Sequence, residues 1–307
     1  MPMTTIPLRL ATCCIALLAT GCLGFTAGVE EPDLTAQAAQ VHSRIVPGTT
    51  TRQEVRALLG TPIFESLDWG VEIYRSEQTD TSTEWMVVLL VPVPGWTEVR
   101  DYRLYPLVVY SPSDLVQGLG AGQYAEHHRG DGAFKSPEGT SAEVLGFTLA
   151  VDPCDGPTCV WLLAPAERSV AYLRAPPTPG YCVINLRKPE NGVEVALDQQ
   201  ARMSSIGSGS GLGDSVPAEP WYARIPVSPG THTLRATPTG PSLAVAGELL
   251  RTIDCRGDQL FVVHVASQFQ KATSFFSRAQ LTGDIQVFES ADAVPSGARA
   301  ILFHGAR

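Results

Sequence analysis

Histidine and carboxylate side chains are the first candidates for chemistry in this chain of 307 residues, because both types bind metals and transfer protons. One group gathers in a short polar stretch, where Glu126, His127, His128 and Asp131 lie close together in sequence. Their spacing is not the H-E-x-x-H of a zinc-binding helix, and adjacent histidines on an extended chain point to opposite sides. We therefore predict a solvated loop here and no metal site.

Nucleophilic and phosphate-binding patterns are also missing from the sequence. A serine nucleophile is typically carried by a G-x-S-x-G turn, which the chain does not contain. The Gly/Ser tract 204–215 matches neither phosphate-loop pattern, so we interpret it as a flexible surface loop. His232 and His264 fall in strand-like runs, where a histidine of the core or of a sheet face is expected. We predict no catalytic residue, no cofactor and no enzymatic activity.

The N-terminus has the layout of a secretion signal. Arg9 precedes the apolar and small residues 10–20, a segment about half as long as the ~20 residues that span a bilayer. The segment ends in Ala19-Thr20-Gly21-Cys22, which resembles the bacterial lipobox, whose cysteine thiol receives diacylglycerol before cleavage. An ordinary secretion signal followed by a chance cysteine is the alternative. Leucine at position 23, where an inner-membrane signal often has aspartate, favours the outer membrane.

Four of the seven cysteines come late in the chain: Cys154, Cys159, Cys182 and Cys255. An even number in an exported protein suggests disulfides. A Gly-Pro turn between Cys154 and Cys159 is compatible with a small closed loop, and Cys182 would then pair with Cys255 by default. A metal or redox site is the rival interpretation, but the spacing is not C-x-x-C and no histidine neighbours these residues.

Composition limits the class of protein. Hydrophobic residues make up 44% and charged residues 17%, which is enough to bury a core, and the length allows two domains. Acidic residues outnumber basic ones 31 to 22, and the formal charge is −9. This balance argues against a nucleic-acid partner.

Helix and strand signals dominate the first half. Thr51 and Glu54 form a capping box that predicts a helix start, and Gly60 with Pro62 predicts its end. Strand-like runs follow, with a turn expected at Pro94-Gly95, and they cover residues 71–76, 85–93 and 99–110. We expect an antiparallel meander covered on one face by helices.

These residues resemble the SmpA/OmlA (BamE-like) family of outer-membrane lipoproteins. The resemblance rests on Pro47-Gly48-Thr49, on Thr51 and Glu54, on Gly60 and Pro62, and on an aromatic strand with Trp69 and Tyr74; it covers about residues 42–120. It implies an α+β domain and a role in outer-membrane assembly or maintenance. Because β-lactamase inhibitor proteins share that fold, an inhibitor-like binder of a periplasmic enzyme is an alternative.

The second half is predicted to be β-rich. Residues 118–142 are rich in glycine and charge, which favours a linker, and a short helix is expected near Pro165. From residue 181 on, short apolar or alternating runs recur at roughly 10–20 residues, which is typical of a small sandwich. The segment 225–234 resembles the hairpin of PEGA-like and carboxypeptidase-regulatory-like modules.

The predicted fold is therefore α+β: helices on a three-stranded antiparallel meander, followed by a small β-sandwich. The expected domains are a signal peptide (1–21), a tether (22–43), the SmpA/OmlA-like domain (44–120), a linker with a disulfide loop and short helix (121–180), the sandwich (181–290) and a tail (291–307). The expected function is that of a non-catalytic envelope lipoprotein that binds a protein partner and the membrane through its lipid. A ligand-binding protein or enzyme with a site between domains is the alternative.

Overall fold

The computed structural model describes most of the chain, in these ranges: 23–27, 34–88, 91–129, 135–153, 158–189, 193–198, 201–204, 220–238, 245–270 and 279–306. The chain divides into two compact units. The first contains Met1–Asp33, Glu77–Tyr102 and Ala125–Ser136, and the second contains Leu34–Ser76, Arg103–Tyr124 and Pro137–Arg307.

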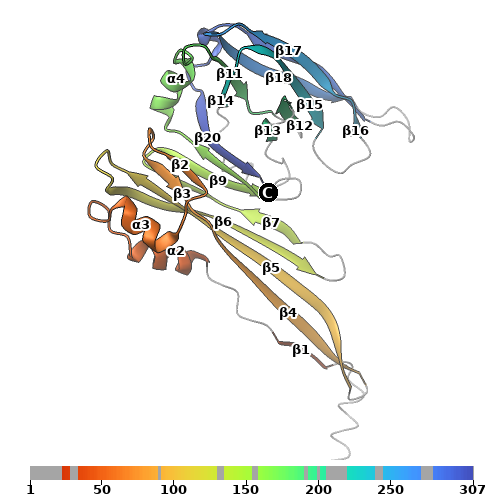
Figure 1. Ribbon diagram of the computed structural model, residues 1–307. Helices are drawn as coiled ribbons and strands as arrows, with labels where there is room; N and C mark the ends of the chain where they lie inside the picture. The colour runs from red at the N-terminus through yellow and green to blue at the C-terminus, as the bar shows by residue number, and fades with distance from the viewer. Residues whose placement is uncertain are drawn as a thin grey trace, which may run out of the picture. The chain divides into compact units, whose positions relative to one another are not determined.

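The protein is mostly β, which corrects the predicted fold class. The described residues contain three α-helices, α2 (Leu34–Ser43), α3 (Arg52–Leu59) and α4 (Ala166–Arg174), and one short 3-10 helix, η1 (Ala291–Ala293). All other elements are strands, arranged in three sheets (Figure 1). An α+β fold with helices on a three-stranded meander is wrong, because segments that the sequence suggested were loops and linkers pair as strands.

The first sheet has seven strands. Its order is β1-β4-β5-β3-β2, with β6 paired to β5 and β7 paired to β6. Their bounds are β1 Leu23–Ala27, β2 Phe64–Ser66, β3 Val71–Ile73, β4 Ser76–Val88, β5 Val91–Tyr110, β6 Val116–Arg129 and β7 Lys135–Gly139. Strand β5 runs through Pro94 and Gly95, so the turn predicted there is not formed. Strand β1 and helix α2 lie within the predicted tether.

The second sheet has nine strands in the order β16-β19-β18-β11-β14-β20-β10-β9-β8. Their bounds are β8 Ser141–Val144, β9 Phe147–Pro153, β10 Thr158–Leu163, β11 Cys182–Arg187, β14 Trp221–Val227, β16 Val245–Ala246, β18 Leu260–Gln270, β19 Ala279–Phe288 and β20 Arg299–Ala306. Strands β8 to β10 come from the predicted linker, and β20 comes from the predicted tail. Both segments belong to the sheet because their apolar residues, such as Leu149, Leu162 and Ile301, are buried in it.

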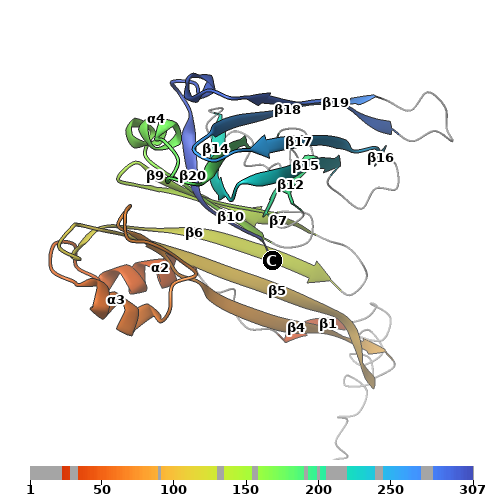
Figure 2. The same cartoon turned by 45° about the horizontal axis from the view of Figure 1, so that its top comes forward.

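The third sheet has four strands in the order β13-β12-β15-β17, with bounds β12 Val193–Leu197, β13 Ala201–Ser204, β15 Gly230–Pro238 and β17 Leu249–Cys255 (Figure 2). One core cluster joins it to the nine-stranded sheet: Val195 and Leu234 of the smaller sheet share that cluster with Trp161 and Ile184 of the larger one. This is the largest described core of the protein, and it extends beyond the predicted sandwich boundaries of 181–290.

Helix α3 begins and ends as its sequence predicts. The Thr51 side chain accepts a hydrogen bond from the Glu54 backbone N–H, and the Glu54 carboxylate accepts one from the Thr51 backbone N–H. Gly60 closes the helix with a positive φ of 83° and donates its N–H to the Arg56 carbonyl. Val55 is buried and shares a core cluster with residues of α2, β5 and β6 and with Tyr74, which follows β3, so α2 and α3 cover one face of this part of the sheet (Figure 1).

Strand β6 carries a stripe of glycines where the sequence suggested a linker. Gly118, Gly120 and Gly122 alternate along the strand and therefore share one face. A Cβ added at any of them would lie 2.4–2.6 Å from a methyl carbon of Val144 or Val151. The missing side chains let β6 approach the strands β8 and β9 closely, so glycine here permits packing and does not break the strand.

Candidate functional site

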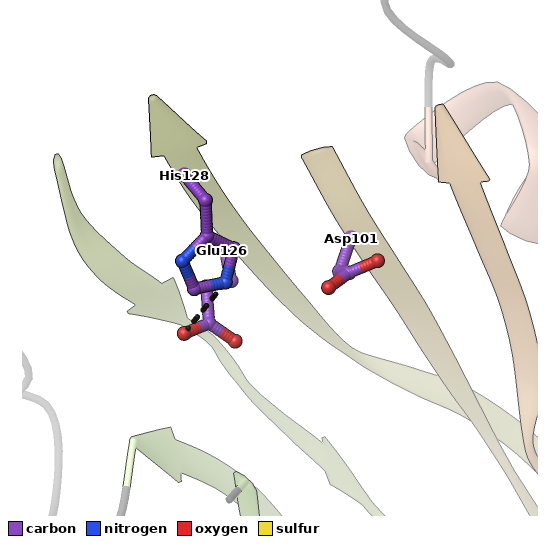
Figure 3. Close-up of side chains that lie close together, drawn as sticks. All are labelled: Asp101, Glu126 and His128. Atoms are coloured by element: carbon purple, nitrogen blue, oxygen red, sulfur yellow. Dashed lines mark ion pairs between the residues drawn. The ribbon is translucent and has the colours of Figure 1, made fainter. Parts of the chain in front are cut away.

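Three side chains that can bind a metal meet on one face of strands β5 and β6 (Figure 3). Glu126 and His128 are two residues apart on β6, so both leave the same face of that strand. Asp101 comes from the neighbouring strand β5, and one ligand atom from each of the three lies within 4.8 Å of the others. His128 Nε2 lies 3.2 Å from Glu126 Oε1. All three residues are partly exposed, so this group is accessible from solution.

The opposite face of β6 carries a different polar group. His127 Nδ1 lies 3.6 Å from Glu98 Oε1, and its ring meets Tyr102 edge-on with centroids 6.0 Å apart. Arg100 donates a hydrogen bond to Glu98, and this bond lowers the pKa of the Glu98 carboxyl. The two adjacent histidines therefore do point to opposite sides, as predicted.

The sequence missed this cluster for two reasons. The predicted loop at Glu126 to His128 is wrong, because β6 continues to Arg129; Asp131 lies outside the described residues. In addition, Asp101 is distant in sequence and reaches Glu126 only through the pairing of β5 with β6. The one available signal was the i, i+2 spacing of Glu126 and His128.

A second feature is a hollow of about 460 Å³ in the larger unit, which we call the Trp69 hollow. Its walls come from the β2–β3 turn, the end of β5, the β8–β9 turn and the start of α4. Trp69 packs edge-on against Phe147 and Tyr172, with centroids 6.2 and 5.3 Å away, and the Arg168 guanidinium lies 4.2 Å above its ring. The charged lining residues are Arg52, Asp68, Asp114, Glu167 and Arg168.

A tight turn positions Trp69. Gly70 has a positive φ of 62°, and a Cβ there would lie 2.7 Å from the Tyr110 carbonyl oxygen. Glycine is therefore required at this position, since any side chain would push β3 away from β5. Tyr110 in turn donates its backbone N–H to the Gly70 carbonyl at 2.7 Å. The turn thus holds Trp69 at the wall of the hollow.

Two large apolar side chains line the Trp69 hollow and remain exposed. Leu67 is 70% exposed and Leu145 is 57% exposed. Leu67 belongs to the β2–β3 turn and Leu145 to the β8–β9 turn, so distant segments supply the two residues. Exposed leucines around an aromatic wall, with charges nearby, are typical of a protein-binding surface.

A buried carboxylate lies beneath helix α3. Glu72 on β3 is fully buried, and its oxygens accept hydrogen bonds from Arg56 and from the hydroxyls of Tyr74 and Tyr110, the last at 2.8 Å. Arg52 Nη1 lies 3.7 Å away. Burial is the main cause that raises the pKa of both tyrosines, so their hydroxyls stay protonated as donors. Both oxygens of Glu72 are occupied, which suits a structural role.

His232 and His264, which were expected in strands, each form hydrogen bonds with nearby residues. His232 Nδ1 lies 2.6 Å from Asp198 Oδ2, and its Nε2 lies 2.7 Å from the Ser228 carbonyl oxygen. His264 Nε2 lies 2.7 Å from the Tyr222 hydroxyl, and burial lowers the pKa of His264. The Gly/Ser tract lies outside the described residues after Ser204.

The structure has the predicted disulfide between Cys182 and Cys255, with α-carbons 6.1 Å apart. Cys159 on β10 is buried and also disulfide-bonded, whereas its predicted partner Cys154 lies outside the described residues. Cys22, the predicted lipidation site, lies outside them too, directly before β1.

The remaining predicted residues shape the chain around α3. Gly48 has a positive φ of 78° and donates its N–H to the Val116 carbonyl at 2.7 Å. Thr51, Glu54 and Gly60 form the helix caps described above, and Pro62 follows the helix end. The hydrogen bond from the Thr51 backbone lowers the pKa of Glu54. These residues fix a local fold and do not gather into a binding site.

Comparisons with protein-family models, with curated proteins and with solved structures found no match. The resemblance to SmpA/OmlA and PEGA-like proteins therefore stays a prediction. None of the helices in the described part of the chain is both long and apolar enough to cross a bilayer.

Proposed function

We propose that the protein is a non-catalytic lipoprotein of the bacterial cell envelope, anchored in the outer membrane through Cys22, and that it binds a partner protein at the Trp69 hollow. The partner is another envelope protein, reached from the periplasm or the cell surface. The anchor, the compartment and the binding surface each have separate support.

The sequence Ala19-Thr20-Gly21-Cys22 supports the anchor, because it resembles the lipobox and directly precedes strand β1. The strand begins at the residue after Cys22 and pairs antiparallel with β4, with Leu23 opposite Val87. Segments 85–88 and 91–93 are apolar in sequence apart from Pro92.

The Cys182–Cys255 disulfide supports export. It links β11 of the nine-stranded sheet to β17 of the four-stranded sheet, and both residues are buried. Structural disulfides persist in oxidising compartments and are rare in the cytosol. A protein that depends on such a bond is expected to fold outside the cytosol.

The Trp69 hollow carries the binding proposal. Burying exposed apolar groups is the main driving force of most protein association, and Leu67 and Leu145 offer such groups on both sides of an aromatic wall. Tryptophan and arginine are the residue types most often found at energetic centres of interfaces, and Trp69 and Arg168 stack here at 4.2 Å. The occupant is therefore a protein segment with an apolar side chain between polar or charged neighbours.

Site-specific photo-crosslinking in living cells tests the binding proposal. A photoreactive amino acid at Leu67 or Leu145 is expected to trap the same envelope protein, identified by mass, and Leu67→Asp is expected to abolish trapping from position 145. Leu250 on β17 is the matched control, because it is 55% exposed and lies outside the hollow. Identical products from positions 67, 145 and 250, or none from 67 and 145, would refute the proposal.

Metabolic labelling with a palmitate analogue tests the anchor separately. Wild type is expected to be labelled and Cys22→Ala is not. Cys13→Ala is the matched control, since it removes another cysteine near the N-terminus and should leave labelling unchanged. Equal labelling of the Cys22 variant and wild type, or no labelling of either, would refute a lipid at this position.

A further inference from the structure

We propose that Asp101, Glu126 and His128 form a zinc site that joins strands β5 and β6 (Figure 3). The site lies within the smaller of the two units, where all three side chains are described. It is independent of the lipid anchor and of the Trp69 hollow, and neither of those proposals needs it.

The spacing of the donor atoms fits a zinc ion. Zinc bonds to histidine nitrogen and carboxylate oxygen are about 2.0–2.2 Å long, so neighbouring donors in a tetrahedral site lie roughly 3.3 Å apart. His128 Nε2 and Glu126 Oε1 already lie 3.2 Å apart. Asp101 completes a triangle in which no two donor atoms are more than 4.8 Å apart. To bind the same ion, an oxygen of Asp101 would have to lie closer to the other two donor atoms than the 4.8 Å limit.

A hydrogen bond from a third strand orients the aspartate. Thr79 of β4 donates from Oγ1 to Asp101 Oδ1 at 2.7 Å. Hydrogen bonds of this kind fix the direction of a metal-binding carboxylate and raise the affinity of the site. The second oxygen of Asp101 is then the one expected to face the ion.

The mixed donor set selects the metal. Calcium and magnesium take six or more oxygen ligands, whereas this site offers two carboxylates and an imidazole. Zinc accepts nitrogen and oxygen together and is satisfied by three protein ligands and one water. Part-exposed side chains, with His128 39% exposed, leave room for that water.

Zinc titration of the purified full-length protein, stripped with chelator and carrying no histidine tag, tests the proposal. One zinc ion per chain is expected, with tetrahedral visible bands when cobalt is used as the probe. His128→Gln, Glu126→Gln and Asp101→Asn are each expected to weaken zinc binding by at least about tenfold, and Thr79→Val by about tenfold. The first three substitutions are close in size to the native residues, and circular dichroism checks that the sheet survives.

The other face of β6 supplies matched controls. His127→Gln and Glu98→Gln change the same residue types on the same two strands but leave the three ligands untouched. Zinc affinity should stay at the wild-type value in both. Equal loss in His127→Gln and His128→Gln, no loss in any ligand variant, or equally tight binding of magnesium would overturn the proposal.

The pH dependence gives a second readout. Because zinc binds an unprotonated imidazole nitrogen, the zinc affinity should fall as the solution is made more acidic. The wild type and His127→Gln should show this loss to the same extent. A zinc affinity that does not change between about pH 8 and pH 6 would contradict a histidine ligand.

Discussion

Glu72 shows how one residue can fix the contact between a helix and a sheet. It is buried, and both its oxygens are held by Arg56 of α3 and by two tyrosine hydroxyls. Removing one partner of a buried ion pair leaves the other charge uncompensated and typically costs 3–5 kcal/mol. Since Arg56 is partly exposed and can relax towards water, we expect the lower end of that range.

The first prediction is that Glu72→Gln lowers the free energy of unfolding by about 3 kcal/mol. Glu65 on the neighbouring strand β2 also pairs with Arg52 and Arg56 of α3, but its side chain is 38% exposed. Glu65→Gln should therefore lower the free energy of unfolding by less than about 1 kcal/mol. Denaturant unfolding of both variants measures this. Equal costs would show that burial of Glu72 does not matter.

The surroundings of His232 favour the imidazolium form of its ring, in which both nitrogens carry a proton. Its two nitrogens face the Asp198 carboxylate and the Ser228 carbonyl, and both of these are acceptors. Burial alone would lower the pKa of His232, but the hydrogen bonds to Asp198 and Ser228 outweigh it, so the pKa is raised above 6.5. This stabilisation is fully present below pH 6.5 and is lost as the pH rises through the folded-state pKa.

The second prediction follows from the raised pKa of His232. His232→Gln should cost about 2 kcal/mol near pH 6, because a hydrogen bond to a charged group is lost, and less near pH 9. His264→Gln is the control of opposite sign, because burial lowers the pKa of His264 and its neutral form is favoured as the pH rises. Denaturant unfolding across this pH range measures both. The same trend in the two variants would contradict the assignment.

Among the strands, β6 depends on its glycine stripe, Gly118, Gly120 and Gly122, to pack closely against β8 and β9. The third prediction is that Gly120→Ala lowers the free energy of unfolding by about 1–3 kcal/mol, because its Cβ would lie 2.4 Å from the Val144 Cγ2 atom. Gly297→Ala is the control, since a Cβ there meets no atom within 4 Å and its φ is ordinary. It should have no measurable cost in the same unfolding experiment. If both variants are neutral, β6 does not pack closely against β8.

Local signals predicted the helix ends but not the sheets. Thr51, Glu54 and Gly60 act through neighbours a few residues away, so the sequence alone located α3 correctly. Gly118 to Gly122 act through residues of β8 and β9, and glycine spacing without those partners suggests a linker. For the same reason, the group of Asp101, Glu126 and His128 could not be predicted from the sequence. Glu126 and His128 are close in sequence, but Asp101 lies near them only because β5 pairs with β6.

At the scale of the whole molecule, the Cys182–Cys255 bond joins two sheets across the largest core. It closes a long loop, with a sequence separation of 73 residues. The fourth prediction is that the double variant Cys182→Ser/Cys255→Ser loses about 2–4 kcal/mol of unfolding free energy. Wild type treated with reductant should approach the same value. A variant as stable as the oxidised wild type would show that the core alone holds the sheets together.

A lipid on Cys22 would determine the compartment in which the protein and its partner meet. The most direct measurement is the mass of the N-terminal peptide of the protein isolated from its native envelope. We predict a chain that begins at Cys22 and carries a diacylglycerol on its sulfur. A chain that begins at Met1, or one cleaved elsewhere with an unmodified Cys22, would contradict a lipid anchor at this residue.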